Sequence, residues 1–442
     1  MRVRRTALAV VSTALLLAGG CASRATTPGD GAPKGIRLYG VDGNMSNSLG
    51  AALKTRGLIS GMMGTTPLTP LSPDFKQRLF ATDPSLVDYT YAGEAYDAVV
   101  ITALAVQVAH TVDPGVVAKH INGVTTGGVE CSSIKECLNA IAAGKGIAYR
   151  GVTVRTGFTD VGEPSTTSYG TLHFGPDDKI DNGKTEFVSA GDGNSATTAK
   201  PPAPAPTPTQ SGGKGRETRE TLKLGILLAK TGGLARLTPP IFAGAHLAIK
   251  EINALGGVLG RPITYEDGDD GTDPVKAGAQ LDKFIQEGIG IIIGPSTSGQ
   301  SVALIPKAVA ANRILFSPSA TSAVLTKADD HGLYFRTAPS DSYQSQALAD
   351  VIMRGGGRRV YIVGRSDAYG TGIRDGVTDD LVKVGIKKVD IGSMTYQEDQ
   401  KDFSDIVQSV KSFNPDSIVI AGYAESAKVI EAMTGAGITF IR

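Results

Sequence analysis

Two loops rich in hydroxyl side chains follow two neighbouring apolar runs of strand length. The run 289–293 leads into Ser-Thr-Ser-Gly at 296–299, and the run 314–316 leads into Ser-Pro-Ser-Ala-Thr-Ser at 317–322. Hydroxyl groups and backbone N–H groups at helix starts can bind a carboxylate without an arginine. Ser and Thr also cap helices in every class of protein. Two such loops on neighbouring strands nevertheless favour an anion-binding site.

An acid and two tyrosines also follow predicted strands. Asp42 comes at the end of the run 38–41 and precedes Gly43, so its carboxylate is a candidate partner for a cationic group. Tyr369 and Tyr423 follow the runs 359–363 and 417–420, and tyrosine can cover a ligand with its ring while its hydroxyl binds a partner. Each has an ordinary alternative, a turn for Asp-Gly and a packed loop for either tyrosine.

Motifs of known enzyme classes are incomplete in this chain. Gly183-Lys184-Thr185 ends like a phosphate-binding loop, but Asp178 occupies the position of the required upstream glycine. Asp375 replaces the third glycine of a dinucleotide fingerprint, and Ser298 stands where a nucleophile elbow needs glycine. We therefore expect no enzyme activity and no cofactor.

The N-terminus has the pattern of a bacterial lipoprotein signal peptide. Three arginines precede the apolar run 7–18, which ends in Gly19-Gly20-Cys21. The run is shorter than the roughly 20 residues needed to span a bilayer. We expect cleavage before Cys21, acylation of its thiol, and a flexible tether to the outer face of the cell membrane. An ordinary secreted protein with an incidental cysteine is the alternative.

Export from the cytoplasm would expose the other two cysteines to oxidising conditions. Cys131 and Cys137 form an even pair in a chain bound for an oxidising compartment, which favours a disulfide over two buried thiols. The five histidines are scattered and none has ligand spacing to a cysteine, so we expect no metal site. A net charge of +1 gives no reason to expect a nucleic-acid partner.

Strand and helix patterns alternate through most of the chain. Continuous apolar strands that alternate with helices indicate parallel sheets covered by helices on both faces, and their number indicates two lobes. The expected strands are 38–41, 222–228, 262–266, 289–293, 314–316, 359–363, 388–391 and 417–420, with paired extended segments in 172–188 around the turn Asp181-Asn182-Gly183. The expected helices are 92–109 (amphipathic), 116–121, 240–255, one from Thr272-Asp273-Pro274, 300–311, 340–354, 372–384, 403–412 and 424–434.

These segments together resemble the leucine/isoleucine/valine-type substrate-binding proteins of ABC importers. The similar segments include LKLGILLAKTGG, AGAHLAIKEINALGG, GPSTSGQS, SPSATS, DAYGTG, IAGYAES and LYGVDG. The resemblance implies a type I periplasmic-binding α/β fold: two lobes, each a mostly parallel sheet sandwiched by helices, with the ligand in the interlobe cleft. It assigns the ligand carboxylate to Ser298, Ser319 and Thr321, the ligand ammonium to Asp42, and the lid to Tyr369 and Tyr423. It also matches a disulfide between Cys131 and Cys137.

The order of the halves departs from that family. The residues from Leu222 onward correspond to the first part of the family sequence, and residues 38–188 correspond to the rest of it. The Pro-rich segment 194–221 joins the two parts. Ile441-Arg442 also repeats Ile36-Arg37, so we interpret the chain as circularly permuted. The implied parts are a signal peptide (1–20), a tether (21–35), lobe II (36–81, 166–193 and 339–442), lobe I (82–165 and 222–338) and a linker (194–221).

The implied function is that of a monomeric receptor which binds an amino acid, branched-chain or similar, by lobe closure and delivers it to permease subunits in the membrane. The alternative is a sensing module of the same fold for amino acids, amides or urea-like solutes. Thr231-Gly232-Gly233 stands where the family often has Ser-Gly, which weakens any ligand contact expected there.

Overall fold

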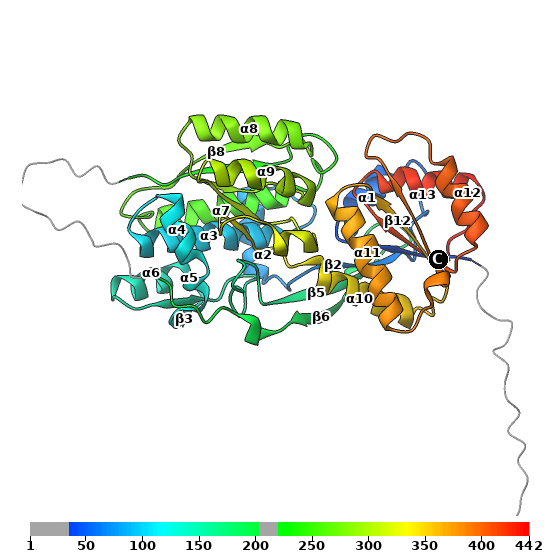
Figure 1. The fold of residues 1–442 in the computed structure, drawn as a ribbon, viewed down its shortest axis with the longest axis horizontal. Coiled ribbons are helices and arrows are strands. Elements are labelled where there is room, and N and C mark those ends of the chain that lie inside the picture. The colour runs from blue at the N-terminus through cyan, green and yellow to red at the C-terminus, as the bar shows by residue number, and fades with distance from the viewer. Residues whose placement is uncertain (1–34, 203–219, 442) are drawn as a thin grey trace, which may run out of the picture. The chain divides into compact units, whose positions relative to one another are not determined.

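The computed structural model describes residues 35–202 and 220–441, which belong to one compact unit (Figure 1). Cys21, the predicted signal peptide, residues 203–219 of the predicted linker and Arg442 lie outside the described residues.

A five-stranded parallel sheet is built from the segments that follow the linker. Its strands, in spatial order, are β11 (Tyr334–Arg336), β10 (Ile314–Ser317), β9 (Ile291–Ile293), β7 (Lys223–Leu228) and β8 (Thr264–Asp269). Continuous apolar strands such as Ile291–Ile293, buried throughout, are typical of parallel sheets covered on both faces.

Helices cover both faces of this sheet. Alternate side chains of β7 point to opposite faces: Ile226 joins the core formed with α3 (Ala92–Ala109) and α7 (Pro239–Ala254), whereas Leu227 joins the core formed with α8 (Pro274–Gln286) and α9 (Ser298–Ala310). Figure 1 shows these helices around β8 and its neighbours. Because side chains alternate along the strand, the sheet lies between one layer of helices with α3 and α7 and another with α8 and α9.

A second sheet has seven strands drawn from both halves of the chain. Their spatial order is β13 (Ile391–Tyr396), β12 (Val360–Arg365), β14 (Ser417–Ala421), β1 (Arg37–Gly40), β2 (Met63–Pro67), β5 (Thr166–His173) and β6 (Glu186–Gly191). The first five strands are parallel, and β5 and β6 are antiparallel to their neighbours. Tyr39 of β1 and Val419 of β14 pack against α10 (Asp341–Arg354) and α11 (Ala368–Lys383). The other face packs against α1 (Asn47–Ala52), α12 (Ser404–Phe413) and α13 (Ser426–Gly435).

The remaining helices and strands come from the first half of the chain. They are α2 (Pro73–Thr82), α4 (Pro114–Ile121), α5 (Gly123–Thr126), α6 (Ile134–Ala142), β3 (Val129–Cys131) and β4 (Ile147–Tyr149), with β3 and β4 forming a small parallel pair. Cys131 and Cys137 form a disulfide between β3 and α6, with their Cα atoms 5.3 Å apart. The predicted crosslink is therefore present.

Helix α3 is buried on every side rather than amphipathic, so that prediction was wrong. Among the described helices, it alone is long and apolar enough to cross a membrane, and 89% of it is buried inside the protein. Its tightest neighbour is α7, and a β-carbon at Gly244 of α7 would lie only 2.1 Å from Ala92 O. Glycine at 244 therefore lets the two helices approach closely. Helix α3 is a core helix of the folded protein.

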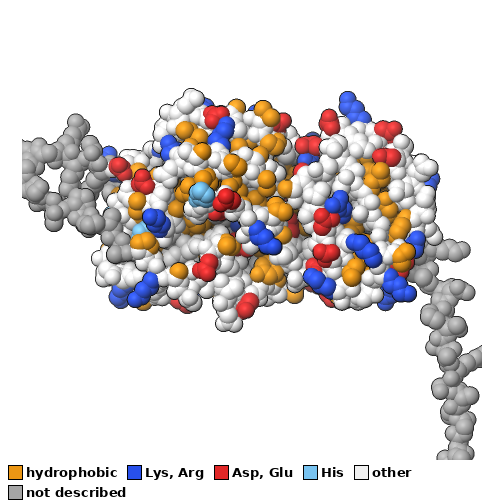
Figure 2. Space-filling model, viewed as in Figure 1, with side chains coloured by type: hydrophobic (Ala, Val, Ile, Leu, Met, Phe, Trp, Pro, Cys, Tyr) orange, Lys and Arg blue, Asp and Glu red, His pale blue; other side chains and the backbone are white. Residues whose placement is uncertain are grey.

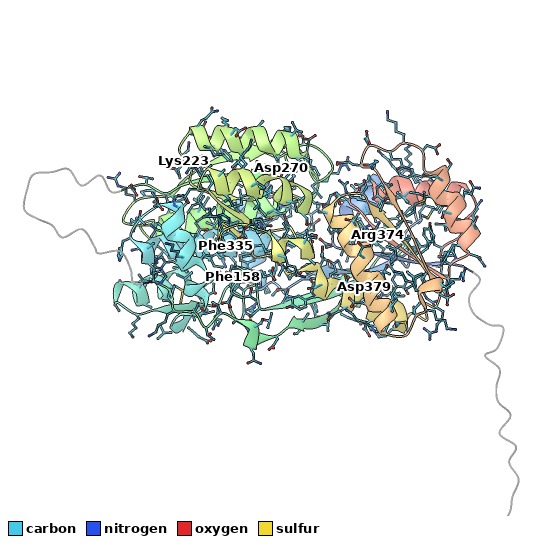
Figure 3. The ribbon with its side chains drawn as sticks, viewed as in Figure 1. Phe158, Lys223, Asp270, Phe335, Arg374 and Asp379 are labelled. Carbon is cyan, nitrogen blue, oxygen red and sulfur yellow. A yellow bond between two sulfur atoms is a disulfide. The ribbon has the colours of Figure 1, made fainter. Side chains whose placement is uncertain are left out.

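An aromatic cluster also joins the two halves of the chain. Phe158 packs edge-on against Phe316 of β10 with ring centroids 6.1 Å apart, and Phe316 lies 5.7 Å from Phe335 of β11. Figure 3 labels Phe158 and Phe335, which lie inside this part of the molecule. On the face shown in Figure 2, acidic and basic side chains are interspersed rather than gathered into one charged patch.

Several predicted boundaries differ from the structure. Residues Lys388–Asp390 form a 3-10 turn rather than a strand, and the strand β13 follows it as a half-exposed edge strand. Strand β8 runs to Asp269 rather than ending at 266, and α11 begins at Ala368 rather than Gly372 because Asp367 caps it. The segment around Asp181-Asn182-Gly183 is a 3-10 turn within a longer connection, not a tight hairpin turn, although β5 and β6 do pair.

The first residues of the predicted linker pack against the protein. Thr197 is buried, its N–H donates to Phe158 O at 2.7 Å, and its hydroxyl donates to Asp160. Pro201 lies against Gly123 at the start of α5. The chain is therefore fixed to the folded unit at least as far as Pro201.

Candidate functional site

One cavity gathers all six side chains that the sequence predicts to bind a ligand. Its described lining is Asp42, Gly43, Thr90, Tyr91, Leu234, Leu237, Thr238, Ile241, Ser296, Ser298, Ser319, Thr321, Tyr369 and Tyr423. The predicted residues follow the carboxyl ends of β1, β9, β10, β12 and β14. Strands β1, β12 and β14 belong to the seven-stranded sheet, and β9 and β10 belong to the five-stranded sheet. The loops that follow the carboxyl ends of both sets of parallel strands meet at this cavity.

The hydroxyl side of the cavity is formed around the start of α9. Thr297 caps this helix reciprocally with Gln300, which leaves Ser298 in the first turn, where backbone N–H groups have no partner within the helix. Ser298 Oγ accepts a hydrogen bond from Ser322 N at 3.0 Å, so its own hydrogen remains free to donate to an anion. Ser319 Oγ instead donates to Ser296 O at 2.8 Å. Ser298 is thus better placed than Ser319 to donate to a carboxylate.

The acidic side of the cavity is Asp42, which is 5% exposed. Tyr369 donates its hydroxyl to one carboxylate oxygen at 2.6 Å, and Tyr91 donates to the other at 2.7 Å. Burial raises the pKa of Asp42, and these hydrogen bonds partly offset that rise by favouring the charged form. Because each carboxylate oxygen can accept more than one hydrogen bond, Asp42 keeps acceptor capacity for a cationic group.

The two predicted lid tyrosines stack on each other. The ring centroids of Tyr369 and Tyr423 are 5.2 Å apart, with 13° between the ring planes. Gly43 fits beneath them because it has no side chain: a β-carbon there would lie 2.7 Å from Tyr423 Cδ1 and 2.9 Å from Tyr369 Oη. The glycine after Asp42 therefore permits this packing, and is more than a turn residue.

An apolar wall was missed by the sequence analysis. Leu234, Leu237 and Ile241 line the cavity from the β7–α7 connection and the start of α7. They lie just beyond Thr231-Gly232-Gly233, where Thr231 Oγ1 donates to Asp269 at 2.8 Å and does not line the cavity. Apolar residues in a loop carry no periodic signal, so only the fold reveals that they face a cavity.

Two further buried groups beside the cavity were also missed. Tyr91 is the N-terminal flanking residue of α3 in a left-handed conformation (φ 57°), which directs it toward Asp42. Asp341, 1% exposed, donates its N–H to Thr321 O at 2.8 Å. Burial, and then the nearby charge of Asp42, raise the pKa of Asp341 well above its ordinary value. Asp341 therefore holds a proton more readily than an exposed aspartate.

The cavity is narrow and is crossed by contacts between the two sheets' loops. Its volume is about 30 Å³, room for a few water molecules at most. Ser322 Oγ donates to Ala368 O at 2.8 Å, and the Tyr91–Asp42 bond joins α3 to the end of β1. An organic ligand can enter only if these loops move apart. In the described part of the chain, no group of three or more His, Cys, Asp or Glu side chains is arranged to hold a metal.

A family model described as periplasmic binding protein matches residues 221–442, half of the chain. The chain belongs to the periplasmic binding protein family. The Leu/Ile/Val-binding protein BraC3 of Rhizobium johnstonii is 32% identical over 206 residues, which cover 46% of this chain and 54% of that protein. The Leu/Ile/Val-binding protein of Escherichia coli K12 is 30% identical over 221 residues, 50% of this chain and 59% of that protein.

Among solved structures, the substrate-binding protein LivJ from Streptococcus pneumoniae, crystallised with isoleucine, is 28% identical with a TM-score of 0.43. That match covers 50% of this chain and 63% of LivJ. This periplasmic binding protein thus spans less than two thirds of the length of the relatives it matches. It is an α/β protein with mostly parallel sheets flanked by helices, as its sequence predicts.

Proposed function

We propose that this protein is a substrate-binding component of an ABC importer which binds an aliphatic amino acid and delivers it to membrane permease subunits. The observation that carries the proposal is the arrangement of polar and apolar groups around the cavity that contains Asp42 and Ser298. This cavity has a buried carboxylate at Asp42, hydroxyls at the start of α9 and in the β10 loop, and an apolar wall between β7 and α7. These groups match an ammonium, a carboxylate and an aliphatic side chain.

The proposed binding mode assigns one role to each wall. Ser298 and Thr321, with the N-terminus of α9, bind the carboxylate, and Asp42 pairs with the ammonium. Ser319 assists only if its hydroxyl leaves Ser296 O. Tyr369 and Tyr423 cover the ligand, and Leu234, Leu237 and Ile241 contact its side chain. The two lobes open to admit the amino acid and close around it. The protein acts by binding and does not catalyse a reaction.

Calorimetry with matched ligands tests this proposal. Leucine, isoleucine or valine should bind, whereas leucinamide, which lacks the carboxylate, and 4-methylpentanoate, which lacks the ammonium, should bind at least about tenfold more weakly. Equal binding of leucine and leucinamide would contradict the proposed role of Ser298 and Thr321 in binding the ligand carboxylate. The absence of binding to any amino acid would overturn the proposal.

We also propose that the chain is a circular permutant of the family order. Strand β1 lies between β14 and β2, and Ile441 N donates to Ile36 O at 3.0 Å while Ile36 N donates to Thr439 O. The end of the chain therefore lies beside the start of β1, where the family order would run from α13 directly into this strand. The proposed lobe II is the seven-stranded sheet with its helices, and lobe I is the five-stranded sheet with α3.

Anchoring through Cys21 is proposed from the sequence alone. The small residues before Cys21 support cleavage and acylation there. Cys21→Ser should release the protein into the medium or leave it uncleaved in fractionated cells. Membrane retention of the Ser variant equal to that of the wild type would contradict a lipid anchor.

A further inference from the structure

A buried arginine packs against the pair of tyrosines, Tyr369 and Tyr423, that lines the cavity. Arg365 ends strand β12 and its side chain is 4% exposed. Its guanidinium carbon lies 4.4 Å from the ring centroid of Tyr423, and the Tyr423 ring also stacks on Tyr369. Tyr369 in turn donates to Asp42. Arg365, Tyr423, Tyr369 and Asp42 thus form one continuous chain of contacts from the protein interior to the acidic side of the cavity.

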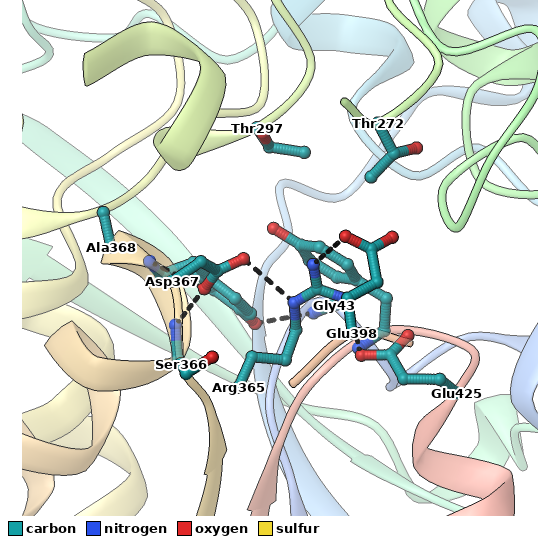
Figure 4. Close-up of polar contacts among 12 residues, drawn as sticks. Gly43, Thr272, Thr297, Arg365, Ser366, Asp367, Ala368, Glu398 and Glu425 are labelled. Carbon is teal, nitrogen blue, oxygen red and sulfur yellow. Dashed lines mark hydrogen bonds and ion pairs between the residues drawn. The ribbon is translucent and has the colours of Figure 1, made fainter. Parts of the chain in front are cut away.

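Three carboxylates from three elements hold this guanidinium (Figure 4). Arg365 donates to Asp367 at 2.9 Å, to Glu398 at 3.0 Å and to Glu425 at 2.8 Å. Asp367 caps α11, Glu398 follows β13, and Glu425 precedes α13. The planar donors of arginine can satisfy several carboxylates while the guanidinium face stays against a ring, which a lysine ammonium cannot do.

The same carboxylates fix the backbone of both tyrosines. Asp367 accepts from Tyr369 N at 3.1 Å, and Glu425 accepts from Tyr423 N at 3.0 Å. Arg365 therefore links the two groups that place the tyrosines, and it also packs on one of their rings. Glu398 lies against Gly233 of the β7–α7 connection, beside the apolar wall.

We infer that Arg365 is a positioning residue of the ligand site: it keeps Tyr423 stacked on Tyr369 so that the Tyr369 hydroxyl stays on Asp42. This inference rests on the proposed function for its effect on ligand affinity. Its effect on the tyrosine pair is independent of any ligand. Arg365 itself does not line the cavity.

The chain supplies a control arginine at the opposite end of the same strand, which is more exposed than Arg365 (41% against 4%) and has one ion pair rather than three. Arg359, just before β12, lies 4.3 Å over the ring of Phe413 and pairs with Asp390 at 3.1 Å. It has the same kinds of contact as Arg365 but none with the cavity lining. Arg359→Met therefore reports the cost of losing a stacked, ion-paired arginine without any effect on the site.

The test compares Arg365→Met, Arg365→Lys and Arg359→Met by leucine calorimetry and by the tyrosine band of the near-ultraviolet circular dichroism. The chain has no Trp, so this band reports tyrosines without tryptophan overlap. We expect Arg365→Met to weaken leucine binding by about tenfold or more and to change the band. Arg365→Lys, which keeps the charge among the carboxylates, should recover part of both. In a Tyr423→Leu background, Arg365→Met should cause a much smaller change in the band, because only Tyr396, which donates to Glu425, still reports on this arginine.

Arg359→Met should leave leucine affinity at the wild-type level, because Arg359 contacts no residue that lines the cavity. An unchanged tyrosine band and unchanged leucine affinity in the Arg365→Met variant would overturn the inference. So would equal losses of affinity in the Arg365→Met and Arg359→Met variants at equal loss of melting temperature. If the wild type binds no amino acid, the proposed function fails, and the tyrosine band alone then decides whether Arg365 positions the pair.

Discussion

The Tyr369 hydroxyl donates a 2.6 Å hydrogen bond to Asp42, although the two residues are 327 positions apart in the chain. One comes from the start of α11 and the other from the end of β1, whose strands β12 and β1 are both neighbours of β14. The contact therefore depends on the correct assembly of the seven-stranded sheet from both halves of the chain. The position of the Asp42 carboxylate in the proposed site therefore depends on how this sheet assembles.

Replacing Asp42 should abolish tight amino-acid binding. Asp42→Ala removes the buried partner of the ligand ammonium, and a lost charge-assisted contact of this kind costs about 2–5 kcal/mol of binding free energy. Calorimetry with leucine measures the loss. Asp399→Ala, which changes an exposed acid, is the control and should bind like the wild type. Undiminished binding by the Asp42 variant would remove Asp42 from the site.

Amino-acid affinity should also depend on pH. Burial raises the pKa of Asp42, and a bound ammonium favours its ionised form. A fraction of free protein therefore has to release a proton on binding when the pH is near or below this raised pKa. Leucine affinity should weaken as the pH falls between about pH 7 and about pH 4, where leucine itself remains a zwitterion. A flat profile over that range would contradict a raised pKa at Asp42.

Glu94 should make the folded protein less stable at alkaline pH. Burial raises its pKa from 4.5 to about 8, and nearby Asp97 adds to the rise. Because the folded state then holds a proton that the unfolded state has lost, the free energy of unfolding falls as the pH rises from about 4.5 to about 8. Glu94→Gln should remove this fall, so the Gln variant should gain a few kcal/mol relative to wild type near pH 9, about the value expected from the shift.

Urea unfolding at acid and alkaline pH measures this difference. Glu136 provides a control of opposite sign, because hydrogen bonds from Ser132 and Ser133 at the start of α6 lower its pKa. Its contribution is present above its ordinary pKa and is lost as the pH falls, so Glu136→Gln should be less stable than wild type at neutral and alkaline pH, and this difference should disappear at acid pH. The same pH profile for the Glu94→Gln variant and the wild type would contradict the burial effect.

Patterns in the sequence were sufficient for the elements that are long or continuously apolar. Helix α7 and strand β14 appear where the sequence places them, because their apolar spacing is unbroken. The three-residue strand β11 was missed, since its conformation depends on pairing with β10 rather than on its own residues. Strand β13 was placed too early because, as an edge strand, it is only partly buried.

Some residues of the candidate site could likewise be predicted from the sequence, and others could not. Asp42 and Ser298 could be predicted because each follows an apolar strand, where an α/β fold places its ligands. Leu234 and Tyr91 could not, since an apolar loop residue and a residue before a helix give no local sign of facing a cavity. Asp341 looks like an ordinary residue at a helix start, and only its burial beside Asp42 sets it apart.

The disulfide should contribute modestly to stability. Cys131 and Cys137 close a loop with five residues between them, and loop-entropy reasoning gives about 2 kcal/mol for so short a loop. Urea unfolding of Cys131→Ser/Cys137→Ser measures the loss. Thiol titration of denatured, unreduced protein that carries Cys21→Ser should find no free thiol, because the chain has three cysteines. Two free thiols would contradict the crosslink.

The two halves of the chain should fold only together. Segment 36–193 contains β1, which lies between β14 and β2, and α3, which packs on α7. Each half alone exposes apolar faces meant for the other, and a partial core is marginally stable. Expressed separately, 36–193 and 222–442 should be insoluble or unfolded, and should recover a cooperative melt only when mixed. Two soluble, cooperatively melting domains that do not associate would contradict the permutation.

The burial of α3 on all sides also sets an order of events during synthesis. The ribosome releases this helix well before α7, the neighbour that covers much of its surface. Until α7 arrives, the most apolar helix of the described chain has no partner from the later half, and exposed apolar surface of this kind favours aggregation. Completion of the core around α3 therefore requires the second half of the chain.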